Sequence, residues 1–170
     1  MNNFKKVYHF CTKEFYEKLK EKQIIKVDNR KSTGNNKFAY NYLFKEKNIN
    51  NGNGMFFLWS DLYNKGYNIK YCSEVEANYV LLELDIPKDI AVDTNYDNWC
   101  SFIMDLYEAD GDYQLADKIC REEFGIKNGL EGSYNSIYDI NLDTKIIQTL
   151  VPYLDYNWIK SIKYTKNKVA

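Results

Sequence analysis

The sequence of 170 residues has one histidine, two prolines and four cysteines that show no CxxC spacing. A zinc site needs several cysteines or histidines at short intervals, so this pattern argues against one, and we predict no bound metal. In a reducing compartment we expect the cysteines to be small, mostly buried thiols.

The chain also lacks an excess of either charge, with 23 basic and 24 acidic residues and a formal net charge of −1. Without a basic excess, nonspecific attraction to phosphates is weak, which argues against a dedicated nucleic-acid binder. No apolar run approaches the length of a membrane span, and the polar start at Met1–Asn3 lacks the apolar core of a signal peptide. We therefore expect a cytoplasmic protein with no membrane partner, and the oligomeric state stays open.

Standard catalytic and nucleotide-binding motifs are missing. The GNG at 52–54 precedes a predicted strand, whereas phosphate-binding glycine loops follow strands and open helices. The DGD at 110–112 lacks the ligand series and the terminal Glu of a calcium loop, and there is no GxSxG nucleophile elbow. No function follows from a standard motif.

Aromatic residues are abundant instead, with 16 Tyr, 9 Phe and 3 Trp. A tyrosine buries its ring while its hydroxyl needs a partner, so this composition is typical of a core that grades into polar grooves. A codon bias that also favours Asn and Lys is the alternative, and composition alone does not separate the two.

The hydrophobic pattern predicts strands and helices in mixed order. The expected strands are 6–10, 55–59, 78–87, 144–152 and 158–165, and the expected helices begin after Thr12, at 38, after Thr94 and at 113. The glycines of 127–136 indicate a loop, and Thr94 and Asp97 have capping-box spacing. Because regular βαβ alternation is absent, we predict an α+β fold, with a single domain at 1–170, small mixed or antiparallel sheets and flanking helices.

Four polar residues within the predicted strands are candidate site residues. His9 lies between two aromatic residues, where a core or half-buried histidine is the alternative to a functional one. Gln148 lies in an apolar run, and its amide needs partners from either a loop backbone or a ligand. Glu83 and Asp85 share one strand face and are either an acid/base or metal pair, or simply solvated.

Taken in order, four segments resemble ADP-ribosyltransferase-fold proteins of the DarT type. VYHFCTKEFYEKLKEKQII is similar to their opening strand and helix, and GMFFLWSDLY is similar to their aromatic strand. NYVLLELDIP, followed by VDTNYDN, resembles their next strand and loop, and IIQTLVPYLDYNWIKSIKY resembles their closing segment. Residues 145–164 also resemble the C-terminal end of an uncharacterised bacterial domain family. The resemblance covers most of the chain and implies an ADP-ribosyltransferase-like fold.

The resemblance implies NAD as the substrate and gives roles to particular residues. His9 matches a histidine that contacts the nicotinamide ribose, and Gln148 stands where a catalytic glutamate is expected. Glutamine can hydrogen-bond a ribose hydroxyl but cannot carry negative charge toward an oxocarbenium ion. The stretch that begins at Trp59 lacks the arginine that contacts the phosphates in the family. Trp59 and Tyr42 are candidates to contact the cofactor, with core packing as the alternative for both.

Three functions follow from the resemblance and its departures. We predict the first, a divergent NAD-dependent transferase that uses Gln148 for binding and Glu83 or Glu131 as the catalytic carboxylate. Its acceptor would be a macromolecule, either protein or nucleic acid, in a toxin or phage-defence setting. The second is a related reaction that dispenses with the glutamate, as in the RNA 2′-phosphotransferases of the same fold. The third is a noncatalytic nucleotide- or protein-binding module of that fold.

Overall fold

The chain divides into two compact units, each with its own buried core. The computed structural model describes residues 3–26, 34, 36–45, 55–60 and 78–164. The sheet unit consists of Met1–Lys26, Phe56–Val92 and Gln148–Ala170, and the helical unit consists of Val27–Met55 and Asp93–Ile147. The single domain expected from the sequence stays a prediction.

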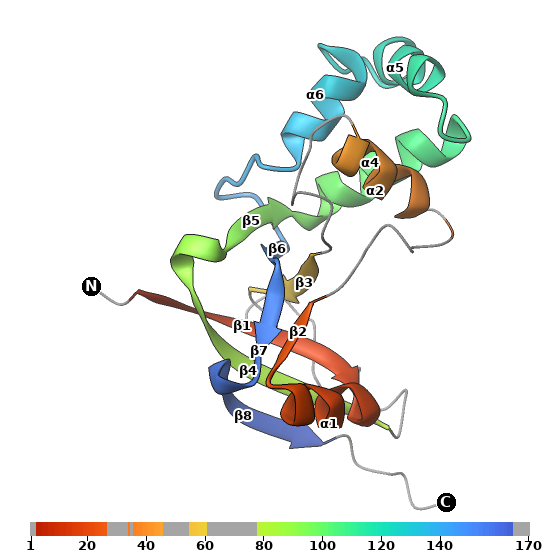
Figure 1. Ribbon diagram of the computed structural model, residues 1–170. Coiled ribbons are helices and arrows are strands. Elements are labelled where there is room, and N and C mark those ends of the chain that lie inside the picture. Colours follow the sequence, from red (N-terminus) through yellow and green to blue (C-terminus); the bar gives the residue numbers. More distant parts are fainter. Residues whose placement is uncertain (1–2, 27–33, 35, 46–54, 61–77, 165–170) are drawn as a thin grey trace, which may run out of the picture. The chain divides into compact units, whose positions relative to one another are not determined.

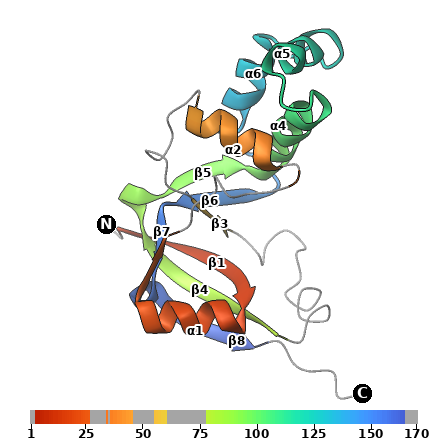
Figure 2. The same cartoon turned by 45° about the vertical axis from the view of Figure 1, so that its right-hand side comes forward.

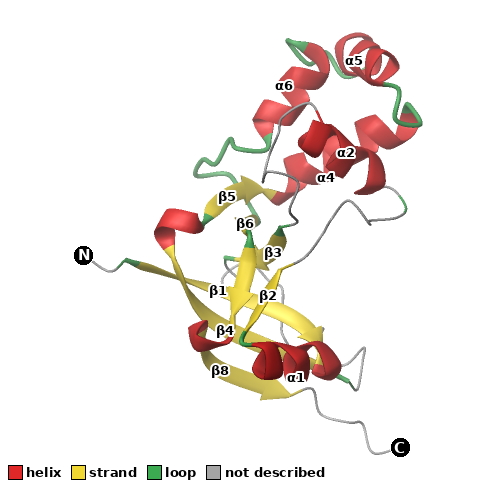
Figure 3. Cartoon of the chain, viewed as in Figure 1, coloured by secondary structure: helices red, strands yellow, loops and turns green. Residues whose placement is uncertain are grey.

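Six strands form the main sheet in the order β5-β6-β3-β1-β4-β8 (Figure 1). Their bounds are β1 (Phe4–Thr12), β3 (Phe56–Trp59), β4 (Tyr79–Pro87), β5 (Val92–Asn95), β6 (Ile147–Val151) and β8 (Ile159–Tyr164). All pairings from β6 across to β8 are antiparallel, and β2 (Ile24–Lys26) pairs antiparallel with β7 (Tyr153–Asp155). Figure 3 separates these strands from the helices, and the predicted α+β class is confirmed.

Strand β4 forms the apolar centre of the sheet unit. Its alternating residues Val80, Leu82, Leu84 and Ile86 are all fully buried, as their period of two predicts. β1 pairs with β4 along its whole length, and β8 lies on the other side of β4. The segments that contain His9, Trp59, Glu83 and Gln148 therefore supply the adjacent strands β1, β3, β4 and β6.

Helix α1 (Lys13–Lys22) follows β1 directly and begins where the sequence predicts (Figure 2). The Thr12 side chain accepts a hydrogen bond from the backbone N–H of Phe15 at 3.1 Å, which is N-cap geometry. Tyr16 and Leu19 are the buried residues of this helix. They lie three positions apart and so share one helical face.

The helical unit contains α2 (Asn36–Lys45), α4 (Tyr96–Glu108), α5 (Tyr113–Glu122) and α6 (Gly129–Ser136). Short 3-10 turns lie elsewhere, at η3 (Lys88–Ile90) and η4 (Tyr156–Trp158). Phe102 is fully buried, and its ring contacts the rings of Tyr42, Trp99 and Tyr134. Trp99 is a core residue, as predicted. No helix within the described ranges is long and apolar enough to cross a membrane.

The capping box predicted at Thr94 is wrong by one residue. Asn95 is the N-cap of α4, because its side-chain oxygen accepts hydrogen bonds from the N–H groups of Asp97 and Asn98. Thr94 instead lies in β5 and is buried. The cap is the residue directly before the helix, and the strand β5 (Val92–Asn95) that precedes it was not predicted from the sequence.

The loop predicted at 127–136 is also wrong, because residues 129–136 form α6. Leu130 and Tyr134 lie one turn apart and are both buried. An Asp117 carboxylate oxygen of α5 accepts a hydrogen bond from the N–H of Leu130 at 3.0 Å and so satisfies a donor near the start of the helix. Packing and this long-range cap override the low helix propensity of the glycines.

Candidate functional site

A straight row of side chains crosses the sheet unit from β6 to β8. The strand registers pair Gln148 with Trp59, Trp59 with Tyr8, Tyr8 with Glu83, and Glu83 with Ser161. Residues directly opposite each other in antiparallel strands point to the same face. We call these five residues the Gln148 row. Three of them were predicted as site residues from the sequence.

His9 lies on the opposite face of the sheet from this row. It follows Tyr8 in β1, and successive strand residues point to opposite faces. Ring contacts agree, since the His9 ring lies 5.6 Å from that of Phe15 and 5.9 Å from that of Phe56. Phe56 is three residues from Trp59 in β3 and so also faces away from the row. The structure therefore does not bring His9 and Gln148 together in one pocket.

The surroundings of His9 make it a neutral side chain at physiological pH. Burial lowers the pKa of His9 to about 4, although part of the side chain remains exposed. Its two ring contacts are both edge-on contacts with phenylalanines. This position matches the half-buried, structural alternative for His9, and a neutral imidazole still offers one hydrogen-bond donor and one acceptor.

Glu83, a member of the row, forms an ion pair with Lys6. Lys6 Nζ lies 2.6 Å from one Glu83 oxygen, and Ser161 donates a hydrogen bond to the other at 3.4 Å. The hydrogen bond from Lys6 is the main reason that the pKa of Glu83 lies below its usual value. A general acid or base works best with a pKa near the working pH, so this carboxylate suits binding better than proton transfer.

The two residues predicted to be catalytic stand at separate points of the row. Gln148 on β6 and Glu83 on β4 are three strand spacings apart, or about 14 Å between backbones. Gln148 is buried, with 5% of its surface exposed, whereas the Glu83 side chain is 24% exposed. This backbone spacing favours contacts with different parts of an extended ligand over joint action on one sugar carbon.

Tyr42 belongs to the core of the helical unit. It is 6% exposed, and its hydroxyl donates a hydrogen bond to Glu131 at 3.1 Å. Its ring contacts those of Phe102, Tyr113 and Tyr134. Tyr42 therefore packs in the core, which was the alternative to its predicted contact with the cofactor. Glu131, the other candidate carboxylate, is the acceptor of this buried hydroxyl.

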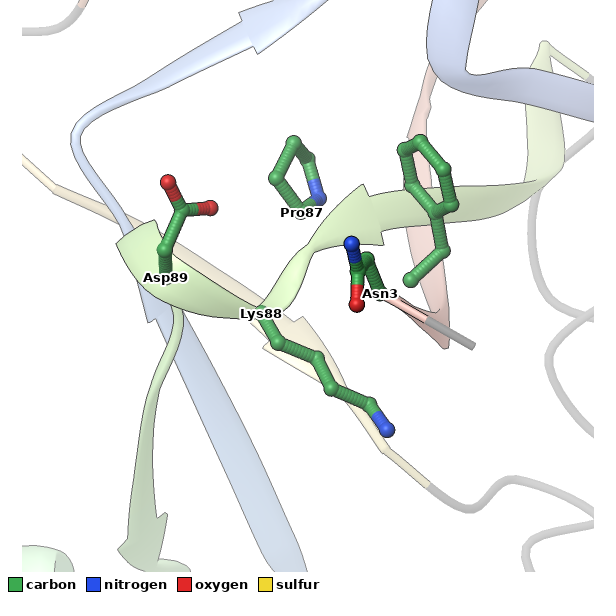
Figure 4. A pocket seen from close by; sticks show the side chains of 5 residues that line it. Asn3, Pro87, Lys88 and Asp89 are labelled. Atoms are coloured by element: carbon green, nitrogen blue, oxygen red, sulfur yellow. The ribbon is translucent and has the colours of Figure 1, made fainter. Parts of the chain in front are cut away.

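A separate hollow of about 440 Å³ lies at the end of β4, where the start of the chain meets η3 (Figure 4). It is lined by Asn3, Phe4, Pro87, Lys88 and Asp89. None of the predicted site residues lines it. Among the described residues, no group of three or more histidines, cysteines, aspartates or glutamates is placed to hold a metal ion.

Tyr8 and Ser161 are members of the row that sequence reasoning missed. Tyr8 is adjacent to His9, and His9 was chosen from the sequence because it is the only histidine of the chain. Strand alternation separates their faces, but only the register between strands far apart in the sequence shows which of them meets Trp59 and Gln148.

Comparisons of the chain with family models, with curated proteins and with solved structures find no match.

Proposed function

We propose that the protein is a divergent, NAD-binding relative of ADP-ribosyltransferase-fold proteins, and that the Gln148 row binds the dinucleotide. The observation that carries this proposal is the row itself. Gln148, Trp59 and Glu83 come from three of the four segments that resemble the family, and the strand registers align them on one face. A macromolecule remains the proposed acceptor in a transfer reaction.

The residue types along the row suit a dinucleotide. Trp59 and Tyr8 are cross-strand neighbours, and aromatic side chains stack on nucleobases with about 1–3 kcal/mol per base. Gln148 is buried, and an amide is a group that can hydrogen-bond ribose hydroxyls. Lys6 lies two residues from Tyr8 on the same face, and in place of the missing arginine this cation would exchange its ion pair with Glu83 for a phosphate contact. A span of about 14 Å suits an extended ligand rather than one reacting centre.

A second candidate, the noncatalytic nucleotide- or protein-binding module, is favoured by one specific observation. Gln148 occupies the position of the family glutamate. The carboxylate on the same face, Glu83, lies three strand spacings from Gln148 and is ion-paired with Lys6. Loss of nicotinamide from NAD develops positive charge on the ribose, which a nearby carboxylate would stabilise. This face supplies such a group only at a distance.

The binding proposal is tested by thermal unfolding with and without 1 mM NAD or ADP-ribose. A ligand present at about 100 times its dissociation constant stabilises by about 2.7 kcal/mol, which shifts the melting temperature by several degrees. We expect Trp59→Leu to lose this shift, relative to its own ligand-free melting temperature. His9→Gln, on the opposite face, is the matched control and should keep it. Absence of any shift in the wild-type protein, or loss of it only in His9→Gln, would overturn the proposal.

Catalysis is tested separately by release of labelled nicotinamide from NAD. A transferase should release nicotinamide and a proton and leave the ADP-ribosyl group bonded to the acceptor. An NAD hydrolase should release nicotinamide, a proton and free ADP-ribose, because water takes the place of the acceptor group. We expect Gln148→Glu to raise this rate if the row holds the reacting ribose, because it restores the negative charge of the family. NAD binding without turnover in either protein would select the noncatalytic module.

A further inference from the structure

Helix α4 of the helical unit carries a carboxylate within its buried face. The buried residues of this helix are Trp99, Phe102, Asp105 and Leu106. Their spacing of three, three and one is that of a single stripe turned toward the core. Asp105 is only 4% exposed, at a position where the pattern favours an apolar side chain.

Among the described residues, the two side chains that donate hydrogen bonds to Asp105 both contact its Oδ2. Ser133 donates to Oδ2 at 2.5 Å, and the Cys120 thiol donates to the same oxygen at 3.3 Å. Within the described ranges, no lysine, arginine or histidine forms an ion pair with Asp105. Oδ1 thus has neither of these donors, and the buried carboxylate has no countercharge in the described part of the unit.

A hollow of about 540 Å³ opens beside this carboxylate. Its lining consists of Asp105 with Cys100, Ser101, Met104, Phe124 and Ile126. Two of the apolar walls are accessible, since Met104 is 43% exposed and Phe124 is 52% exposed. The volume falls within the roughly 300–1,000 Å³ that is usual for small-molecule sites, and apolar walls with a few polar groups are typical of them.

We propose that this hollow binds a small organic cation, namely an ammonium group carried on an apolar body. A buried carboxylate without a countercharge is unfavourable, and an ammonium group beside Asp105 would supply both the charge and a hydrogen-bond donor for Oδ1. Met104 and Ile126 would contact the apolar body, and the ring of Phe124 can add a cation–π contact. The site lies within the helical unit and does not depend on the NAD-binding proposal.

The charge preference is tested with two probes of the same shape, 2-phenylethylammonium and 2-phenylethanol. In a ligand-detected NMR titration up to about 10 mM, we expect the cation to bind the wild-type protein at least about tenfold more tightly than the alcohol. Asp105→Asn keeps an oxygen that can accept from Ser133 but removes the charge. It should abolish the difference between the two probes. Asp97→Asn, an exposed carboxylate of the same helix, is the matched control and should preserve it.

A second pair of variants keeps the test decisive if Asp105→Asn does not fold. Phe124→Ala removes an exposed wall of the hollow and should weaken binding of both probes. Tyr107→Ala removes a ring of similar exposure, 48% against 52%, from a residue outside the lining and should leave binding unchanged. Equal binding of cation and alcohol to the wild-type protein, or no binding of the cation at about 10 mM, overturns the proposal. So does binding that is insensitive to both Asp105→Asn and Phe124→Ala.

Discussion

His9 in the sheet unit and Asp105 in the helical unit are both ionisable side chains with little contact to water, and the two units accommodate them differently. His9 lies between Phe15 and Phe56, and burial lowers its pKa to about 4, so it adapts by staying neutral. Asp105 lies in the buried stripe of α4 and is held by donors from Ser133 and Cys120. A group that gives up its charge needs little from its neighbours, whereas a buried carboxylate requires a specific set of them.

This difference also separates the places where each unit can hold a ligand. In the sheet unit the polar residues gather on the face away from His9, where Lys6 and Glu83 already neutralise each other. In the helical unit the polar group, the carboxylate of Asp105, is buried and lines a hollow whose other walls are mostly apolar. We therefore expect the sheet unit to select ligands by shape and stacking, and the helical unit to select them by charge.

The largest expected effects come from truncating one core residue in each unit. Phe102→Ala should lower the free energy of unfolding by about 3–5 kcal/mol, and Leu84→Ala by about 2–5 kcal/mol, because both side chains are fully buried. Urea unfolding followed by circular dichroism measures both. If the chain is one domain, as predicted, each variant shifts the same single transition. Two transitions, of which each variant moves only one, would show that the units unfold independently.

The next effect tests how Asp105 is accommodated. Ser133→Ala removes the hydroxyl that donates to the buried carboxylate, and we expect a loss of about 1.5–3 kcal/mol, the range for hydrogen bonds to charged groups. Ser101→Ala is the control, because its hydroxyl bonds an exposed backbone carbonyl of α4. Urea midpoints of the two variants that agree within error would mean that Ser133 contributes little, and the contrast with His9 would then disappear.

Some of this architecture follows from the sequence, and the rest depends on contacts between distant segments. The alternation in β4 and the cap at Thr12 are local, and both were predicted correctly. Helix α6 was missed because its stability comes from the burial of Leu130 and Tyr134 and from the carboxylate of Asp117, none of which a glycine-containing segment reveals. Local patterns specify elements, and tertiary packing decides the marginal ones.

The candidate site shows the same limit. Gln148, Trp59 and Glu83 were chosen separately, and nothing in the sequence states that they share a row. Their alignment depends on three strand registers, and a shift of one residue in any of them would turn a side chain to the other face. For the same reason His9 was grouped with Gln148, although the register of β1 against β3 places it on the other side of the sheet.

A moderate, pH-dependent effect tests the neutral state of His9. Its folded-state pKa of about 4 lies below the usual 6.5, so the unfolded chain binds more protons between these values. The stability contributed by neutral His9 is present above pH 6.5 and is lost as the pH falls toward 4. Because the side chain is partly exposed, we expect a loss of about 1–2 kcal/mol relative to His9→Gln over this range. Parallel stability curves for the two proteins would contradict this.

The smallest expected effect concerns the Lys6–Glu83 pair of the sheet unit. The Lys6 side chain is 56% exposed, so water and salt screen the attraction. Glu83→Gln should lower the melting temperature slightly at low salt, and the difference should shrink at high salt. Because the pKa of Glu83 is held below its usual value, this contribution is present at neutral pH and is lost as the pH falls through that lowered pKa.

The control for this prediction is Glu21→Gln, which changes an exposed carboxylate of α1. A loss in Glu83→Gln that persists undiminished at high salt would mean that Glu83 acts through Ser161 or packing rather than through charge. The polar face of the sheet unit would then resemble the fixed network around Asp105 more than a screened surface pair.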